Sequence, residues 1–82
     1  MRLPRDLSGV ELARHLAPYG YEVRRQTGSH MRLTSLVMGR AHHITIPAHR
    51  CLAVGTLAHI VSDVAVYLER DREELALAMF SG

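Results

Sequence analysis

The sequence of 82 residues contains a single cysteine, Cys51, and no lysine. One cysteine excludes an internal disulfide framework and fits a reducing cytosol. The sequence also lacks a run of about 18 apolar residues, the length that a membrane-spanning helix needs. Its first residues show no signal-peptide pattern. These absences predict a cytoplasmic, soluble protein with no membrane contact.

The absence of lysine makes all ten cationic side chains arginines, and the net charge is only +2. A net charge this small does not by itself identify a nucleic-acid-binding protein. The distribution of charge is more informative, because Arg24, Arg25 and Arg32 lie close together whereas three acidic residues gather within positions 71–74. The planar guanidinium group suits bidentate binding of phosphate. A GC-rich genome would also favour arginine over lysine, so both explanations stay open.

The length and the hydrophobic share of 48% are enough for one core and leave no room for a second. We therefore expect a single domain over residues 1–82. A core of this size stabilises a fold only modestly, so self-association would help.

Capping signals and apolar periodicity predict three helices. Ser8 followed by Glu11 is typical of a capping box, and the first helix should run to about Ala17. Thr56 is expected to cap a second helix, and Asp71 a short third one. The second helix has its apolar residues at helical spacing, namely Leu57, Ile60, Val61, Val64, Ala65 and Leu68.

The third helix carries an apolar stripe formed by Leu75, Ala78 and Met79. We expect too little surface within one chain to cover this stripe. The sequence therefore predicts a contact between chains at the last helix, and with it a possible homodimer.

Between the first two helices, apolar and polar residues alternate in three short segments, which predicts three strands. Their inward residues are Tyr21 and Val23, Met31 and Leu33, and Ile44 and Ile46. Residues 27–29 have turn chemistry, and Pro47 ends the third strand. The predicted fold is α+β, helix–strand–strand–strand–helix, with a three-stranded antiparallel sheet, both main helices on one face, and a short C-terminal helix.

The same alternation places polar side chains on the face of the sheet that the helices leave open. Arginine binds phosphate oxygens through charge-assisted hydrogen bonds, and histidine exchanges protons at neutral pH. RNA cleavage by transesterification needs both phosphate binding and proton transfer. Small polar surfaces of this kind also occur on inert sheets, so a solvated face remains an alternative. The residues concerned are Arg24, His30, Arg32, His43 and Thr45.

The six histidines raise the question of a metal site. His42, His43 and His49 lack the spacing of zinc ligands. Adjacent strand residues such as His42 and His43 point to opposite faces. We expect no metal and no other cofactor.

Three motifs carry a resemblance to a known family: "TGSH" before a strand, "HHITIPAH", and "VGTL" opening a helix. Together with "LSGVELARHLAPYGYEVRRQTGSH", they resemble the HicA (YcfA-like) toxins of toxin–antitoxin systems. The resemblance covers about Leu3 to Val64. It implies an mRNA interferase that acts without the ribosome, with a fold similar to a double-stranded-RNA-binding domain. It also implies that His30 is catalytic and that a HicB antitoxin covers the site.

The residues around His30 also have expected roles. Gly28 is expected at a positive φ, where the absence of a side chain lets RNA approach. Ser29 either donates to a phosphate or caps the turn. His49 matches a "PxH" motif of the family and either supports the site or is an ordinary loop residue. Arg24 and Arg32 are expected to contact RNA phosphates.

The chain departs from the family towards its end. The segment "AHIVSDVAVYL" contains no basic residue where family members carry several, and the tail is acidic. We therefore treat residues 61–82 as including a divergent helical extension. A non-catalytic RNA-binding module and a protein-interaction domain of the same fold remain alternatives to an endoribonuclease.

Overall fold

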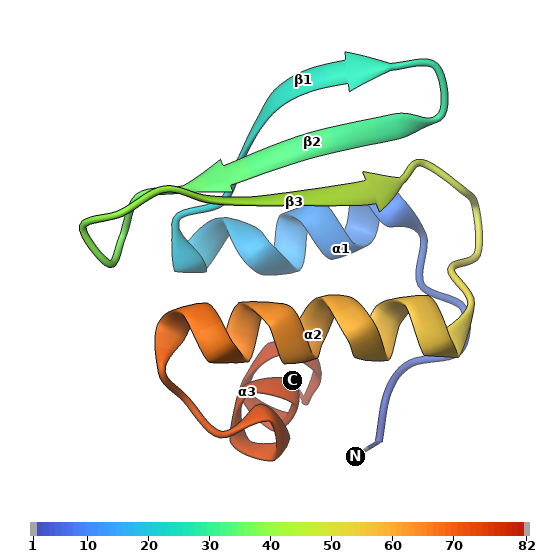
Figure 1. The fold of residues 1–82 in the computed structure, drawn as a ribbon. Coiled ribbons are helices and arrows are strands. Elements are labelled where there is room, and N and C mark those ends of the chain that lie inside the picture. The colour runs from blue at the N-terminus through green and yellow to red at the C-terminus, as the bar shows by residue number, and fades with distance from the viewer. Residues whose placement is uncertain (1, 82) are drawn as a thin grey trace.

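A computed structural model describes residues 2–81 and shows the predicted order of elements (Figure 1). A helix and a short 3-10 turn precede three strands, and two helices follow them. The elements are α1 (Gly9–Leu16), η1 (Ala17–Tyr19), β1 (Glu22–Thr27), β2 (His30–Ser35), β3 (His42–Pro47), α2 (Val54–Leu68) and α3 (Arg72–Phe80). The fold class predicted from the sequence is confirmed.

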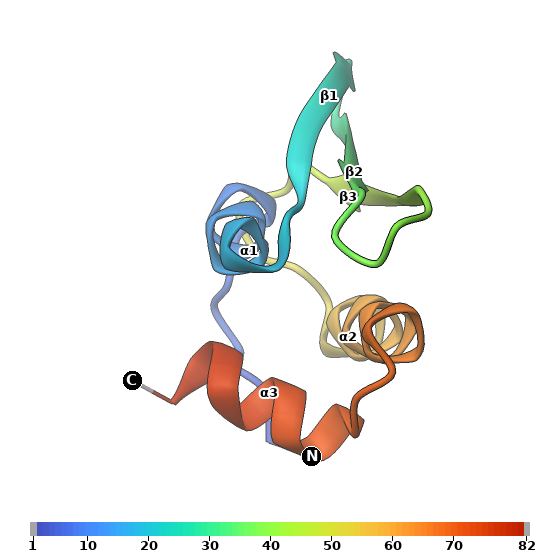
Figure 2. The same ribbon diagram turned by 90° about the vertical axis from the view of Figure 1, so that its left-hand side faces the viewer.

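The three strands form one antiparallel sheet in the order β1-β2-β3. Helices α1 and α2 lie side by side on one face of this sheet, and α3 packs beneath them as a third layer (Figures 1 and 2). Strand β1 lies farthest from the helices, and all six of its residues are exposed. Val23 therefore stays half exposed although it pairs with the buried Leu33.

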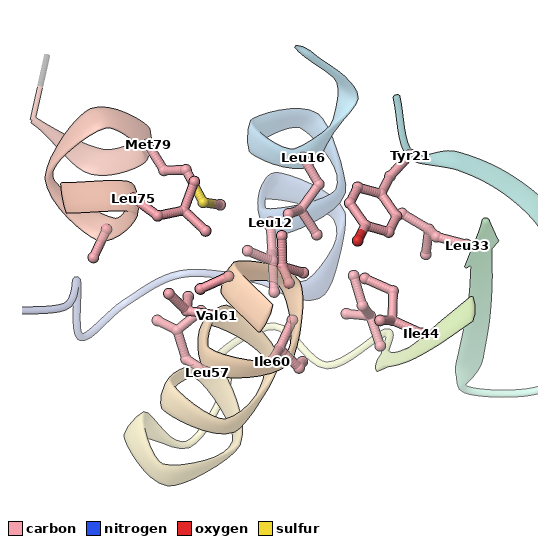
Figure 3. Close-up of a cluster of buried hydrophobic side chains, with 14 of the residues drawn as sticks. Leu12, Leu16, Tyr21, Leu33, Ile44, Leu57, Ile60, Val61, Leu75 and Met79 are labelled. Carbon is pink, nitrogen blue, oxygen red and sulfur yellow. The ribbon is translucent and has the colours of Figure 1, made fainter. Parts of the chain in front are cut away.

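The core lies between the sheet and the two main helices (Figure 3). Fully burying an aliphatic side chain stabilises a fold by about 1.5–3 kcal/mol. The buried side chains of this layer therefore provide most of the hydrophobic stabilisation of the fold. The sheet contributes Leu33, Ile44 and Ile46, α1 contributes Leu12 and Leu16, and α2 contributes Leu57, Ile60, Val61 and Val64.

The predicted capping box of α1 is present. The Ser8 hydroxyl accepts a hydrogen bond from the Glu11 amide at 3.0 Å, and the Glu11 carboxylate accepts one from the Ser8 amide at 2.9 Å. The predicted start of α2 is wrong, because the helix begins at Val54 with Ala53 as its N-cap, two residues before Thr56. Leu52 explains why α2 begins earlier than predicted. Its side chain is buried and its amide donates to the Leu7 carbonyl at 2.8 Å, which fixes the chain just before the helix.

Helix α3 begins as predicted, with the Asp71 carboxylate accepting from the Glu74 amide at 3.1 Å. The prediction that its apolar stripe needs a second chain is wrong. Leu75 and Met79 are buried within the chain, together with Ala76 rather than Ala78. Leu75 and Met79 pack against the side of α1 and α2 that faces away from the sheet, and Figure 3 shows them beside Leu12 and Val61. The stripe therefore provides no argument for a homodimer.

The packing of α1 against β3 depends on Gly9. A β-carbon at this position would lie 2.1 Å from the Pro47 carbonyl oxygen, which is backbone and cannot rotate away. We predict that Gly9→Ala lowers the free energy of unfolding by about 1–3 kcal/mol, the usual cost of overpacking. Urea titration measures the change.

Gly55 provides the matched control, because it also lies in the first turn of a helix and a β-carbon there would meet nothing within 4 Å. Gly55→Ala should leave the stability unchanged or raise it by up to ~1 kcal/mol, since alanine restricts the unfolded chain. Equal losses in the two variants would show that the contact with Pro47 is not the cause.

Candidate functional site

The candidate site begins at the tight turn between β1 and β2. Thr27 pairs with His30, so Gly28 and Ser29 form a two-residue loop, and Gly28 has the predicted positive φ of 56°. Glycine at the first central position is typical of type II′ hairpin turns. The Ser29 carbonyl accepts a hydrogen bond from the Ala48 amide, which holds the turn to the segment after β3. His30 is consequently the exposed first residue of β2.

Residues that pair directly across the strands share a face, so the open face has three rows. The row nearest the turn contains Thr27, His30 and Pro47. The middle row contains Arg25, Arg32 and Thr45, and the far row Glu22, Thr34 and His43. The structure thus places His30, Arg32, His43 and Thr45 on one face, as the alternation predicts.

A β-bulge in β1 changes the middle row. Val23 pairs with Leu33 and Arg25 pairs with Arg32, so Arg24 is an extra residue between them. Both arginines of β1 then oppose Arg32, because two bulged residues face one partner. Strict alternation would have turned Arg25 towards the helices. The only signal in the sequence was a second consecutive arginine where the pattern required an apolar residue.

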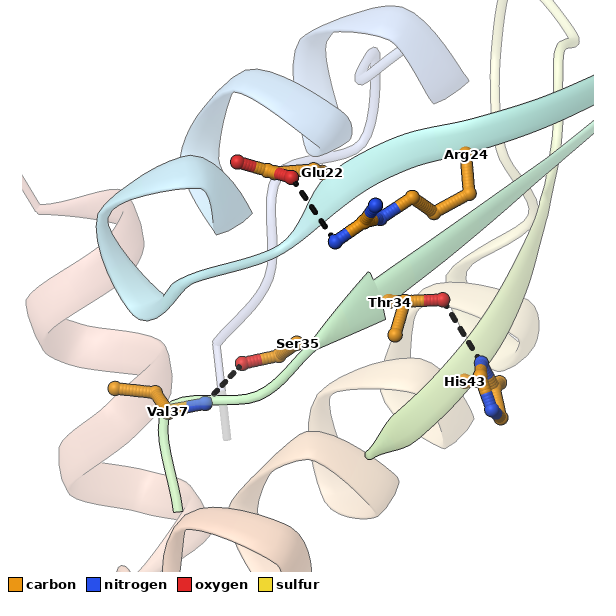
Figure 4. Close-up of polar contacts among 6 residues, drawn as sticks. All are labelled: Glu22, Arg24, Thr34, Ser35, Val37 and His43. Carbon is orange, nitrogen blue, oxygen red and sulfur yellow. Dashed lines mark hydrogen bonds and ion pairs between the residues drawn. The ribbon is translucent and has the colours of Figure 1, made fainter. Parts of the chain in front are cut away.

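The charges of the middle row are only partly compensated. Arg24 forms an exposed ion pair with Glu22 at 3.3 Å (Figure 4). Among the described residues, Arg25 and Arg32 have no carboxylate or hydrogen-bond partner. Like charges directly opposite each other destabilise a strand pair. A bound anion such as a phosphate would relieve this repulsion.

His43 lies too far from His30 to act on the same bond. Its Nδ1 atom hydrogen-bonds the Thr34 hydroxyl at 2.8 Å (Figure 4). Because His30 pairs with Pro47, four residues along β3 separate the two imidazoles, which is about 14 Å including the step between strands. His43 is therefore not the second proton-transfer group for chemistry at His30.

His42 points to the other side of the sheet, as expected for its neighbour in a strand. Its Nδ1 atom lies 2.7 Å from the Tyr21 hydroxyl, its Nε2 atom lies 3.4 Å from the Asp63 carboxylate, and its ring stacks on Tyr67. Burial raises the pKa of the Tyr21 phenol, with the nearby Tyr67 and Asp63 as smaller causes. Tyr21 therefore stays neutral, and the cluster holds the start of β3 in place.

His49 lies in the exposed loop that follows β3. Its carbonyl accepts a hydrogen bond from the Gly9 amide at 3.0 Å, and the preceding Ala48 is bonded to Ser29. The loop thus lies at the same end of the sheet as His30. Neither the His49 ring nor the Ser29 hydroxyl has a hydrogen-bond partner among residues 2–81.

Two general features of the described residues bear on the class of site. No three histidine, cysteine, aspartate or glutamate side chains within residues 2–81 are placed to hold a metal ion. Within the same residues, no helix has the length and apolar character needed to cross a membrane.

A family model described as "HicA toxin of bacterial toxin-antitoxin" matches residues 9–66, from the start of α1 almost to the end of α2. No curated protein and no solved structure matches the chain.

The opposed arginines generate a test that needs no RNA. Arg25→Gln removes one of two facing charges, so it should raise the free energy of unfolding at low salt, on the order of 0.5 kcal/mol. Added inorganic phosphate should stabilise the parent protein, and Arg25→Gln should abolish this stabilisation. Thermal unfolding with and without phosphate measures both effects.

Arg24→Gln is the matched control, because Arg24 has Glu22 as its partner. This substitution should not stabilise the protein at low salt. A stabilisation equal to that of Arg25→Gln would mean that general positive charge, and not the facing pair, is responsible.

Proposed function

Because the chain belongs to the HicA family of bacterial toxin–antitoxin toxins, we propose that it is a cytoplasmic endoribonuclease that cleaves mRNA without the ribosome. His30 is the catalytic acid/base, and Arg25 and Arg32 bind the phosphate, with Arg24 at their side. Gly28, Ser29 and His49 border the approach of the RNA to His30. Membership of the family implies an antitoxin as the protein partner.

The observation that carries the proposal is the uncompensated Arg25–Arg32 pair one row from His30. Side chains two residues apart on a strand are separated by about 7 Å, so a phosphodiester bound to Arg32 lies within reach of the His30 imidazole. The His30 side chain is exposed and is not committed to any described residue. An RNA strand can therefore be held and attacked on the same open surface.

The chemistry that suits this arrangement is transesterification. A base removes the proton from the 2′-hydroxyl, whose oxygen attacks phosphorus while the bond to the 5′-oxygen breaks and that oxygen takes up a proton. The products are a 2′,3′-cyclic phosphate and a 5′-hydroxyl. The two guanidiniums neutralise the charge that builds on the non-bridging oxygens. His30 carries out one of the two proton transfers directly. Water has access to the exposed site and carries out the other.

The first test is His30→Ala. Loss of a general acid or base lowers the rate by about 10²–10⁴-fold, and the fold should persist because an exposed side chain at a strand end supports no core. Cleavage of purified mRNA and circular dichroism measure the two outcomes. His43→Ala, on the same face but in the far row, should retain cleavage.

Each outcome bears on the proposed role of His30. Cleavage by His30→Ala at the parental rate would contradict catalysis by this residue. RNA binding by the parent protein without any cleavage would indicate a non-catalytic RNA-binding module instead.

The second test concerns the arginines. Arg25→Ala and Arg32→Ala should each weaken RNA binding and reduce the log–log salt slope by about 0.7, the value for one phosphate of a single strand. Fluorescence anisotropy across a salt series measures the slope. Arg72→Ala on α3, whose guanidinium contacts Ser62, should leave the slope unchanged. An unchanged slope in both strand variants would place RNA elsewhere.

A further inference from the structure

A run of apolar side chains projects into solvent beyond the far row of the open face. Leu36, Val37 and Met38, in the loop after β2, are 57%, 58% and 37% exposed. We call these three residues the 36–38 surface. Single exposed apolar side chains are ordinary, but three consecutive ones on one loop are a feature of interaction sites.

The backbone of the 36–38 surface is held by a network of hydrogen bonds. The Tyr67 hydroxyl, from α2, accepts from the Met38 amide at 3.0 Å and lies 2.7 Å from the Arg40 carbonyl. The Val37 amide donates to the Ser35 hydroxyl at 3.3 Å, and the Gly39 amide donates to the Leu36 carbonyl at 3.0 Å. Apolar side chains are thus presented on a fixed loop, which lowers the entropy that a partner must overcome on binding.

The 36–38 surface borders a shallow groove that reaches the arginines. The groove has a volume of about 360 Å³, and its lining includes Leu36 and Val37 together with the Glu22–Arg24 ion pair. Figure 4 shows Val37 and this ion pair. Gly20 and Thr34 complete the lining of the groove. A ligand seated here meets aliphatic carbon beside an ion pair, and the uncompensated Arg25 and Arg32 follow in the next row.

These features favour a protein over RNA at this end of the face. Proteins that bind single-stranded RNA hold its bases by stacking them on aromatic rings, and the lining of this groove contains none. An apolar side chain fits against Leu36 and Val37, and a carboxylate that reaches the next row matches Arg25 and Arg32, whose charges no described carboxylate compensates. Interfaces of proteins combine such an apolar anchor with charge complementarity.

We propose that the 36–38 surface is the anchoring site of the antitoxin. The occupant is a segment of that protein in which an apolar residue is followed by an aspartate or glutamate that reaches Arg25 and Arg32. This inference deepens the proposed function, since it rests on the antitoxin partner that the family implies. Leu36 lies six residues from His30, about 20 Å along an extended strand, so the anchor is separate from the catalytic histidine. The antitoxin extends from the anchor across the arginine row to cover the RNA site.

The test uses the protein encoded by the reading frame adjacent to the gene of this chain. The double variant Leu36→Gln/Val37→Thr removes apolar surface without adding charge, so its RNA cleavage should equal that of the parent protein. Its Kd for the adjacent protein should rise at least about tenfold, which corresponds to ~1.4 kcal/mol. Calorimetry measures the Kd, and inhibition of RNA cleavage by the adjacent protein should weaken to the same extent.

Val10→Thr/Leu77→Gln is the matched control, because it makes the same two changes at exposed apolar residues on α1 and α3. Its Kd should equal the parental value. The proposal is overturned if the parent protein does not bind the adjacent protein, if both double variants bind equally well, or if Leu36→Gln/Val37→Thr loses RNA cleavage. Binding by the parent protein without RNA cleavage would refute the proposed enzyme activity and leave the anchor standing.

Discussion

One-sided burial of the sheet is the constraint on which the other features depend. Leu33, Ile44 and Ile46 pack against α1 and α2, and the third helix covers those helices and not the sheet. Since side chains alternate between faces, the residues opposite this apolar layer point away from the helices, and most of them are exposed. The polar rows that contain His30 and Arg32 are therefore a direct consequence of how the core is built. A helix on the other face would have removed the candidate site.

The open face divides into regions with different chemistry along its length. His30 lies at the hairpin turn, the uncompensated arginines follow in the middle, and the 36–38 surface lies beyond the far row. The groups proposed for proton transfer, phosphate binding and apolar contact thus lie along one strand and its continuation. A partner that reaches from the apolar end to the middle row would neutralise the arginines, so under the proposed function the antitoxin and RNA would compete for the same charges.

The sequence predicted correctly which residues of β2 and β3 face the helices, because a one-residue slip would bury His30 and Arg32 and expose the core. It did not predict the bulge at Arg24, since alternation assumes a regular ladder and the insertion of one residue depends on the pairing with β2. The cover of Leu75 and Met79 was also missed. Periodicity identifies an apolar stripe but does not tell whether the same chain or another one covers it.

The central claim is that RNA binds on the open face of the sheet, with a phosphate between Arg25 and Arg32 beside His30. The most direct measurement is a nuclear magnetic resonance titration of the labelled protein with a short RNA that carries 2′-deoxy sugars and so resists transesterification. The account predicts that the largest shift changes fall on His30, Arg25, Arg32 and Thr45, while α3 stays unaffected. Changes concentrated on the helices, with none in the arginine row, would contradict it.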